Sequence, residues 1–344
     1  MHFNRSARHS QSYLVSQHRC DYSFVPFSVR GLMNDRSITL PKDPYYQLID
    51  KDCPEVVGSC NGLVCLSGCF VDDEEFNEDD SEKNISQMWF RIWNPATRTI
   101  SDKLYFRANH LQYWQFMFGY DNSTETYKVV AIYPDSEMTT EVGIICFSNN
   151  IWRNIQSFPA RLLQFSFSSN RTLYAGVHLN STLNWLGFIH NGNLAPQFVI
   201  ISLDLATETY TQFLPPPISL DLSHALQKVS HAKPGVSMLM DSLCFYHDFK
   251  ETDFVIWKMT KFGDENSWAR LLKISYRKLQ MNLKPGISMF NLYVNGDTLV
   301  FVDDQKERAI LYNWRNNRVV KTRVNKKICW FSLNHYVESL VSTS

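Results

Sequence analysis

The sequence has no net charge, because its 34 lysine and arginine residues equal its 34 aspartate and glutamate residues. A chain without net charge has no overall field that concentrates nucleic acid or binds an anionic membrane surface. Long apolar runs are also missing: the longest, such as residues 198–205, have the length of a strand and fall far short of the roughly 20 residues that cross a bilayer. Composition therefore argues against nucleic acid and membranes as partners.

Motifs for catalysis, metals and phosphates are missing as well. The ten histidines are scattered, without the H-x-H or H-E-x-x-H patterns that place metal ligands on one element. No G-x-S-x-G elbow is present, and Gly58, Gly62 and Gly68 do not form a G-x-G-x-x-G loop, so they are predicted to be turn glycines. We expect no catalytic, cofactor-binding or metal-binding residues, and the sequence leaves the substrate-binding residues unassigned.

The eight cysteines are too few and too unevenly placed for a disulfide scaffold. The densest group, Cys60, Cys65 and Cys69, has no C-x-x-C spacing and no nearby histidine, so buried thiols are predicted rather than a zinc site. This usage predicts a reducing compartment, the cytoplasm or the nucleus. The basic, serine-rich first 20 residues leave a transit peptide open as an alternative to a basic strand start.

What the sequence does contain is an internal repeat. Five segments share an apolar strand with an aromatic residue, a short polar turn and a second apolar strand. Their central apolar residues, separated by 54, 56, 56 and 55 residues, are Trp93, Phe147, Leu203, Met259 and Trp314. A second column of residues advances in step with the first: Ile100, Trp152, Tyr210, Trp268 and Val319. A further strand-like run precedes each segment, so each unit supplies at least three strands.

A repeat of this length built only of strands matches a kelch-type blade. One four-stranded blade cannot bury both faces alone, whereas radial stacking buries them and leaves only short edges. The polar turns NPATR, SNN, LATET, GDEN and RNN are predicted hairpin tips. Strand-like runs remain at both ends, so we predict an all-β, kelch-like propeller of six blades with a composite closing blade from both termini. The alternative is five blades with the terminal strands on the rim.

The predicted domain plan is a junction segment over residues 1–12 and one propeller domain over residues 13–342. Residues 72–83 form an acidic loop that should stay solvated, and residues 213–235 form an excursion between blades with a short helix near 223–233. Tyr113, Trp114 and Phe116 are predicted core residues.

Single residues also have structural interpretations. Gly62 is predicted to adopt a positive φ in a turn, and Trp93 to pack between blades. Asp121 and Asp204 are predicted to cap turns through backbone N–H groups, and His178 and His190 to be hydrogen-bonded or surface residues.

Five motifs follow one another along the chain: VVGSCNGLVCL, RIWNPATR, FGYDNSTETYKVV, GVHLNSTLNWLG and FVIWKMTKFGDENSW. Together, over about residues 2–342, they resemble the F-box-associated interaction domain of plant F-box proteins of the kelch-repeat type. The resemblance implies a kelch-like propeller that holds a substrate protein, while an N-terminal F-box docks on a Skp-type adaptor of a cullin ubiquitin ligase. The F-box itself is not found, and the opening HFNRSARHSQSYLVS resembles the family's junction just after it.

We therefore expect a non-enzymatic, protein-binding module that recognises the substrate of an SCF-type ubiquitin ligase. Its partners would be a substrate protein and, only where an F-box lies upstream, a Skp-type adaptor and a cullin. One alternative is a stand-alone scaffold or competitor that binds the same partner without recruiting a ligase. The other is a propeller glycoside hydrolase, although SNNIW and GDENSW lack the Asp and Gly spacing of an Asp-box turn.

Overall fold

The structure of the chain is a computed structural model. It describes residues 12–17, 22–27, 33–35, 55–71, 85–107, 114–134, 140–162, 176–189, 197–217, 234–280, 289–303, 308–322, 332–334 and 339–343. These residues are almost entirely β-strands and turns, with one helical turn at residues 33–35 and a 3-10 helix, η4, at Glu265–Ser267. In the part of the chain that is described, no helix has the length and apolar character needed to span a membrane.

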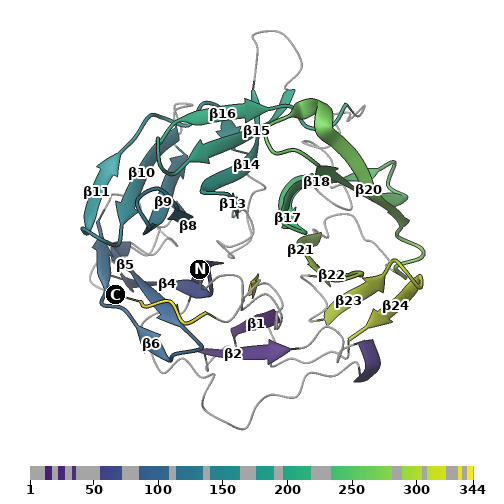
Figure 1. The fold of residues 1–344 in the computed structure, drawn as a ribbon, viewed down its shortest axis with the longest axis horizontal. Coiled ribbons are helices and arrows are strands. Elements are labelled where there is room, and N and C mark those ends of the chain that lie inside the picture. The colour runs from purple at the N-terminus through teal and green to yellow at the C-terminus, as the bar shows by residue number, and fades with distance from the viewer. Residues whose placement is uncertain are drawn as a thin grey trace, which may run out of the picture.

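Five antiparallel sheets of four or five strands form five blades around a central axis (Figure 1). Blade 1 contains β3 (Glu55–Cys60), β4 (Leu63–Val71), β5 (Ile85–Asn94), β6 (Thr99–Ile100) and β7 (Leu104–Phe106). Blade 2 contains β8 (Gln115–Asp121), β9 (Thr126–Pro134), β10 (Thr140–Cys146) and β11 (Ile151–Asn154). Blade 3 contains β12 (Arg161–Leu162), β13 (Val177–Leu179), β14 (Thr182–Ile189), β15 (Gln197–Asp204) and β16 (Tyr210–Phe213).

The remaining two blades have four strands each. Blade 4 contains β17 (Gly235–Leu239), β18 (Ser242–Phe249), β19 (Asp253–Met259) and β20 (Trp268–Ser275). Blade 5 contains β21 (Met289–Asn295), β22 (Thr298–Asp303), β23 (Arg308–Asn313) and β24 (Arg318–Lys321). The predicted all-β propeller is confirmed, and each of the five repeat segments falls on one strand pair of its own blade: β5 and β6, β10 and β11, β15 and β16, β19 and β20, or β23 and β24.

Strands from the two ends of the chain pair with each other in a separate three-stranded sheet. It consists of β1 (Ser12–Gln17), β2 (Tyr22–Phe27) and β25 (Ser332–Asn334). β1 lies in the middle and is antiparallel to both neighbours. The sheet lies between blade 5 and blade 1 (Figure 1), so the strand-like runs predicted at both ends do form strands.

The predicted polar turns join the third and fourth strands of the blades. Short polar side chains hold two of these turns, at Asn94 and Asp204, as well as the turn at Asp121 between β8 and β9. Each of the three side chains accepts hydrogen bonds from the backbone N–H groups two and three residues further on. Gly62 has a φ of +79° in the turn between β3 and β4, a conformation that glycine adopts without steric cost. The capping roles and the positive φ are confirmed. The prediction that Gly58 and Gly68 are also turn glycines is wrong, because they lie within strands β3 and β4.

The apolar core lies between neighbouring blades. Met117 and Ile144 of blade 2, for example, share one cluster with Leu183 and Ile201 of blade 3. The predicted core residue Trp114 and the predicted buried thiols Cys60 and Cys65 belong to a buried cluster between blades 1 and 2, whereas Phe116 and Cys69 are only partly buried and pack against it. Several predictions concern positions outside the described residues: Tyr113, His190, residues 1–11, the acidic loop at 72–83 and the helix near 223–233.

Residues 339–343 are fastened to blade 1 by one buried side chain. Asn94 Nδ2 donates hydrogen bonds to the carbonyl oxygens of Ser339 and Val341, at 3.0 and 2.7 Å. Val341 packs against the cluster between blades 1 and 2. The C-terminal end of the described chain is therefore held twice, to β1 through β25 and to blade 1 through Asn94.

Candidate functional site

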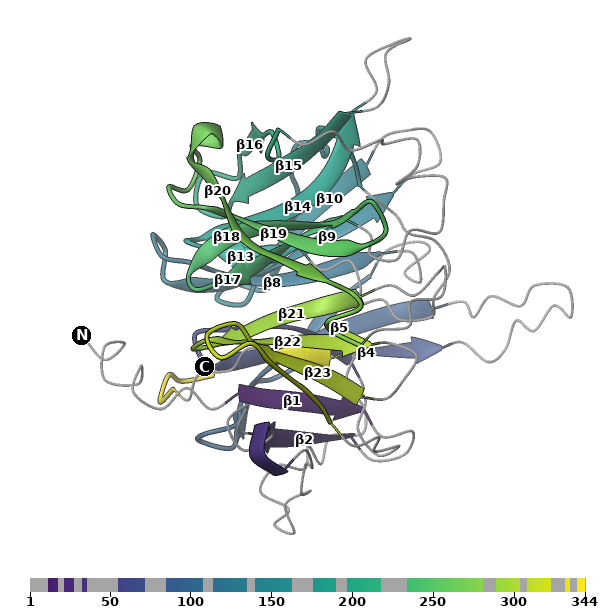
Figure 2. The ribbon, with the colours of Figure 1, turned by 90° about the vertical axis from the view of Figure 1, so that its right-hand side faces the viewer.

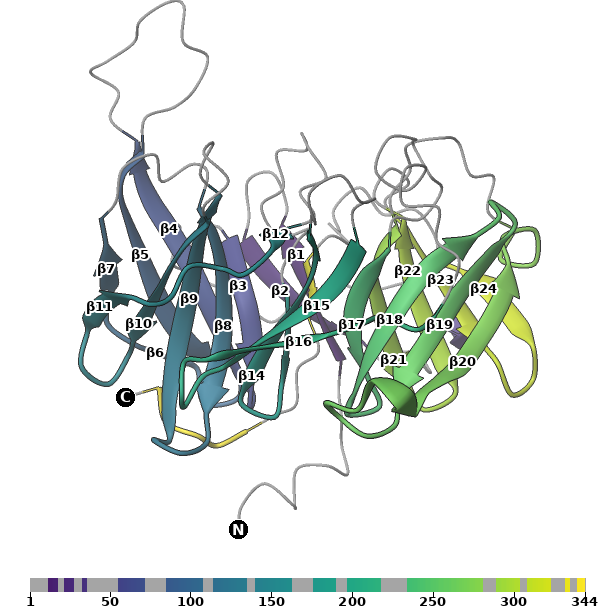
Figure 3. The same cartoon turned by 90° about the horizontal axis from the view of Figure 1, so that it is seen from above.

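The hairpins divide the propeller into two faces, seen edge-on in Figures 2 and 3. The turns from first to second strand and from third to fourth strand of each blade lie on one face, which we call the tip face. The connections from second to third strand lie on the other, which we call the loop face. Tyr13, near the start of β1, pairs with Asn334 at the end of β25. Beyond β25 the chain reaches residues 339–343 at the Asn94 turn, so β1 also starts on the tip face.

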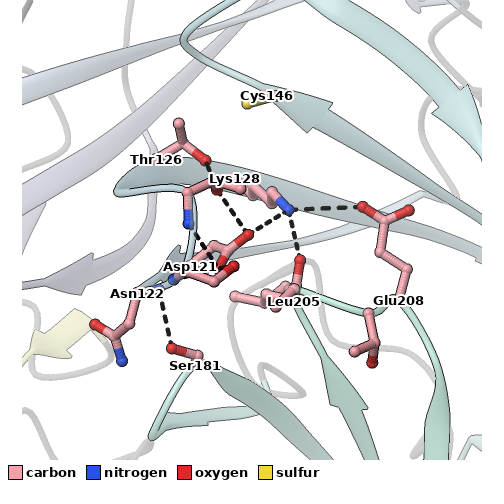
Figure 4. Close-up of polar contacts among 12 residues, drawn as sticks. Asp121, Asn122, Thr126, Lys128, Cys146, Ser181, Leu205 and Glu208 are labelled. Carbon is pink, nitrogen blue, oxygen red and sulfur yellow. Dashed lines mark hydrogen bonds and ion pairs between the residues drawn. The ribbon is translucent and has the colours of Figure 1, made fainter.

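A network of charged side chains joins blades 2 and 3 at the tip face (Figure 4). Asp121 ends β8 and Lys128 follows in β9, and Lys128 Nζ lies 2.8 Å from Asp121 Oδ2. Lys128 also donates a hydrogen bond to the carbonyl oxygen of Leu205 in blade 3 and lies 3.6 Å from Glu208 Oε1. Arg153 of β11 completes the network through a two-pronged ion pair with Glu208.

The centre of the network, the pair of Lys128 and Asp121, is buried. The side chains of Lys128 and Asp121 are only 6% and 0% exposed. Burial acts to raise the pKa of Asp121, but hydrogen bonds from Lys128, Ser123 and Thr124 outweigh it and hold that pKa well below its usual range. A carboxylate that stays ionised in an ion pair is a poor proton donor or acceptor near neutral pH, so the network links blades and does not resemble an acid/base pair.

The thiol of Cys146, at the end of β10 in blade 2, is also buried. Cys146 Sγ lies 3.1 Å from Ser148 Oγ. Burial acts to raise the pKa of the Cys146 thiol, but hydrogen bonds from Ser148 and Thr126 and the charge of Lys128 lower it overall. Across the described residues, no group of three or more His, Cys, Asp or Glu side chains is arranged to hold a metal ion.

Two histidines have structural partners on both ring nitrogens. His178 of β13 accepts a hydrogen bond at Nε2 from the Tyr120 backbone N–H at 3.2 Å, and its Nδ1 lies 3.4 Å from Cys60 Sγ. It therefore joins blade 3 to blades 1 and 2, as a hydrogen-bonded residue. His247 is buried in blade 4, where Nδ1 donates to the Asp248 carbonyl oxygen at 2.6 Å and Nε2 accepts from Trp257 Nε1 at 3.3 Å.

We expect the free energy of unfolding to fall as the pH drops below 6.5. Burial lowers the pKa of both His178 and His247 from the usual 6.5, so the unfolded chain binds protons at a higher pH than the folded chain. The free energy of unfolding therefore falls as the pH drops from 6.5 to the lower pKa values that the two histidines have in the folded chain. NMR titration measures the pKa values of the two imidazoles, and urea unfolding at about pH 7.5 and about pH 5.5 measures the free energy of unfolding. Imidazoles that titrate at or above the usual value would contradict this account.

Exposed aromatic side chains lie on the loop-face half of blade 1. Phe70 of β4 and Tyr105 of β7 are 56% and 54% exposed, and Trp89 of β5 is buried between them. The Trp89 ring centroid lies 4.8 Å from that of Phe70 and 6.3 Å from that of Tyr105. We call these three residues the aromatic row. Pattern reasoning missed them, because the exposure of an aromatic residue in a strand depends on what the neighbouring sheet covers.

Comparison with known proteins gives the following matches. The model of the F-box associated beta propeller domain matches residues 21–343. An F-box/kelch-repeat protein of Arabidopsis thaliana is 26% identical over 278 residues, which cover 79% of this chain and 64% of the relative. This chain thus spans less than two thirds of that relative's length.

Among solved structures, a chain of a nidogen/laminin complex matches 93% of this chain and 95% of its own length, with 9% identity and a TM-score of 0.48. A puromycin-hydrolysing peptidase of Mycobacterium tuberculosis matches 91% of this chain and 45% of its own length, with 13% identity and a TM-score of 0.41. Similarity this low does not bear on function.

Proposed function

Because the chain belongs to the F-box associated beta propeller domain family, we propose that it is the substrate-recognition module of an SCF-type ubiquitin ligase. The observation that carries the proposal is the family match over residues 21–343, which takes in all five blades. Domains of this family are typical of the substrate-binding region of F-box proteins, and the Arabidopsis relative is an F-box/kelch-repeat protein. In this proposal the chain binds a protein and catalyses no reaction.

We further propose that the partner protein binds on the loop face. β1 starts on the tip face, beside the end of β25, so an F-box joined upstream would connect there. Residues 339–343 also occupy part of the tip face, at Asn94. The loop face, with its exposed aromatic side chains, points away from that connection.

The propeller in this proposal has six blades and is kelch-like. The sheet of β2, β1 and β25 serves as the sixth, closing blade, and three observations support this assignment. The sheet lies between blades 5 and 1 (Figure 1), it combines strands from both ends of the chain, and β25 contacts β3 of blade 1. Closure of this kind removes the open edges that two end blades would otherwise present.

The proposed partners are a substrate protein and, through an F-box, a Skp-type adaptor and a cullin. Nucleic acid and membranes are not among them. The proposed location is the cytoplasm or the nucleus, which suits the free thiols of Cys60, Cys146 and Cys244.

Proximity labelling and co-precipitation with a Skp-type adaptor test the proposed function. The chain is compared with a fusion to a known F-box and with the same F-box fused to an unrelated propeller. We expect the chain and its fusion to label the same partner proteins, and only the fusions to recover the adaptor. If the fusion recovers the adaptor but labels nothing beyond the unrelated propeller, the proposed function is wrong. If the chain alone competes with the fusion for partners without adaptor binding, it acts as a competitor when no F-box is joined to it.

A further inference from the structure

We infer that the aromatic row of blade 1, Phe70, Trp89 and Tyr105, is a docking surface for a lysine- or arginine-rich segment of the partner protein. The inference rests on the proposed function, because it names the chemistry of the partner that the propeller holds. It adds to that function the surface that binds the partner, which is the aromatic row, and the positive charge of the segment that binds there.

The row stands on the side of the blade 1 sheet that faces away from blade 2. Trp89 and Tyr105 are directly opposite each other in the pairing of β5 with β7. The residues that alternate with them, Phe90, Leu104 and Phe106, are buried in the cluster between blades 1 and 2. Because successive side chains of a strand point to opposite faces, the row lies on the other face of the sheet.

The row also has the form of an anchoring site. Phe70 and Tyr105 are each more than half exposed, although both rings pack on Trp89. The cross-strand partner of Trp89 on β4 is Gly68, which has no side chain to separate the Phe70 and Trp89 rings. Rings held in place before binding lose little conformational freedom on contact with a partner, and aromatic residues of this kind are common anchors of protein interfaces.

A cation already lies on this row. Lys103 Nζ is 4.3 Å from the centroid of the Trp89 ring. Aromatic faces attract ammonium and guanidinium groups through the negative charge of their π-systems. Phe70 and Tyr105, on either side of this contact, offer exposed rings of the same kind to cations from a partner.

The charge of the chain next to the row favours a basic partner. β4 ends one residue after Phe70, at Val71, and Val71 pairs with Ile85 at the start of β5. The sequence that joins these two residues carries eight carboxylates between Asp72 and Glu82. Both of its ends are joined to the strands that bear the row, so these carboxylates are tethered to the same part of blade 1. Carboxylates tethered in this way attract lysine and arginine and repel acidic segments. The docking surface itself consists of the three rings alone.

Fluorescence anisotropy with two labelled synthetic peptides tests the inference. One peptide alternates arginine with leucine, and its control alternates glutamate with leucine. We expect the purified chain to bind the arginine peptide, with an affinity that falls as salt rises, and the F70A/Y105A variant to bind it about tenfold more weakly. The matched control is Phe249→Ala, since Phe249 is an exposed aromatic residue of blade 4 that lies under Lys273 at 4.1 Å. This control should bind as the unmodified chain does.

Several results would overturn the inference: no binding of the arginine peptide, equal binding by F70A/Y105A, or tighter binding of the glutamate peptide. Thermal melting of F70A/Y105A should match that of the unmodified chain. If it does not, the binding measurement is repeated with F70L/Y105L, which keeps apolar side chains at both positions but removes the rings. The F-box fusion separates this inference from the proposed function. If the F70A/Y105A fusion labels the same partner proteins as the unmodified fusion, only the docking surface is wrong. If the unmodified fusion itself labels no partner protein, the proposed function is wrong.

Discussion

Replacement of Lys128 with methionine should lower the free energy of unfolding by about 3–5 kcal/mol, the usual cost of leaving one charge of a buried pair without its partner. The Asp121 side chain, 0% exposed, would lose the ammonium group 2.8 Å away. The Leu205 carbonyl oxygen of blade 3 would lose its hydrogen bond from Lys128 in the same step. Urea unfolding followed by tryptophan fluorescence measures the change. It is a large part of the roughly 5–15 kcal/mol that stabilises a typical domain.

Two control variants separate burial from charge. Arg153 is 50% exposed, so Arg153→Met should change stability by less than about 1 kcal/mol, as exposed ion pairs do. Asp121→Asn in the Lys128→Met background should recover part of the loss, because it removes the unpaired charge and keeps an acceptor for the Ser123 N–H. If Lys128→Met unfolds within about 1 kcal/mol of the unmodified chain, the network does not hold blades 2 and 3 together.

Gly143→Ala should destabilise the chain by about 3 kcal/mol, at the upper end of the usual cost of overpacking a core. An added Cβ would lie 1.9 Å from Cη2 and 2.0 Å from Cζ2 of Trp152. The Trp152 ring has little room to move, because it packs against Phe106 and Trp114 at centroid distances of 4.4 and 5.9 Å. The clash therefore falls on the interface between blades 1 and 2.

The matched control for this prediction is Gly58→Ala. Gly58 lies in strand β3, and a Cβ there would meet its nearest neighbour, Phe118 Cβ, at 3.4 Å, an ordinary contact. This variant should be close to neutral. The double variant Gly143→Ala/Trp152→Leu should regain part of the stability, because the smaller side chain frees the space above position 143. Equal unfolding midpoints for the two alanine variants would contradict the packing described for Trp152.

The propeller could be predicted because its determinants are local and repeated. Each turn carries its own capping side chain, such as Asn94 or Asp204, and the two apolar columns mark strands at a nearly constant separation. Such signals need no knowledge of what packs beside them. The pairing of β1 with β25 could be expected for a similar reason, since a ring of blades must close.

The candidate sites could not be predicted, because they depend on contacts between distant residues. Lys128 has the appearance of an exposed strand residue in the motif TYKVV, yet Leu205 and Glu208 of the next blade enclose it. The sequence did offer one sign of this ion pair, because Asp121 and Lys128 carry opposite charges on the two strands of one hairpin, β8 and β9. Tyr105 likewise looks like any core aromatic residue until the pairing of β7 with β5 places it opposite Trp89.

Site-specific photo-crosslinking tests most directly whether this propeller holds a partner protein on its loop face. A photoreactive amino acid is placed in the F-box fusion either at Tyr105, on the loop-face half of blade 1, or at Ile151, beside a tip-face turn of blade 2. The two positions are equally accessible, at 54% and 55% exposure. We expect partner proteins to crosslink from position 105 and not from position 151. Crosslinks from position 151 alone, or from neither position while the adaptor is bound, would contradict it.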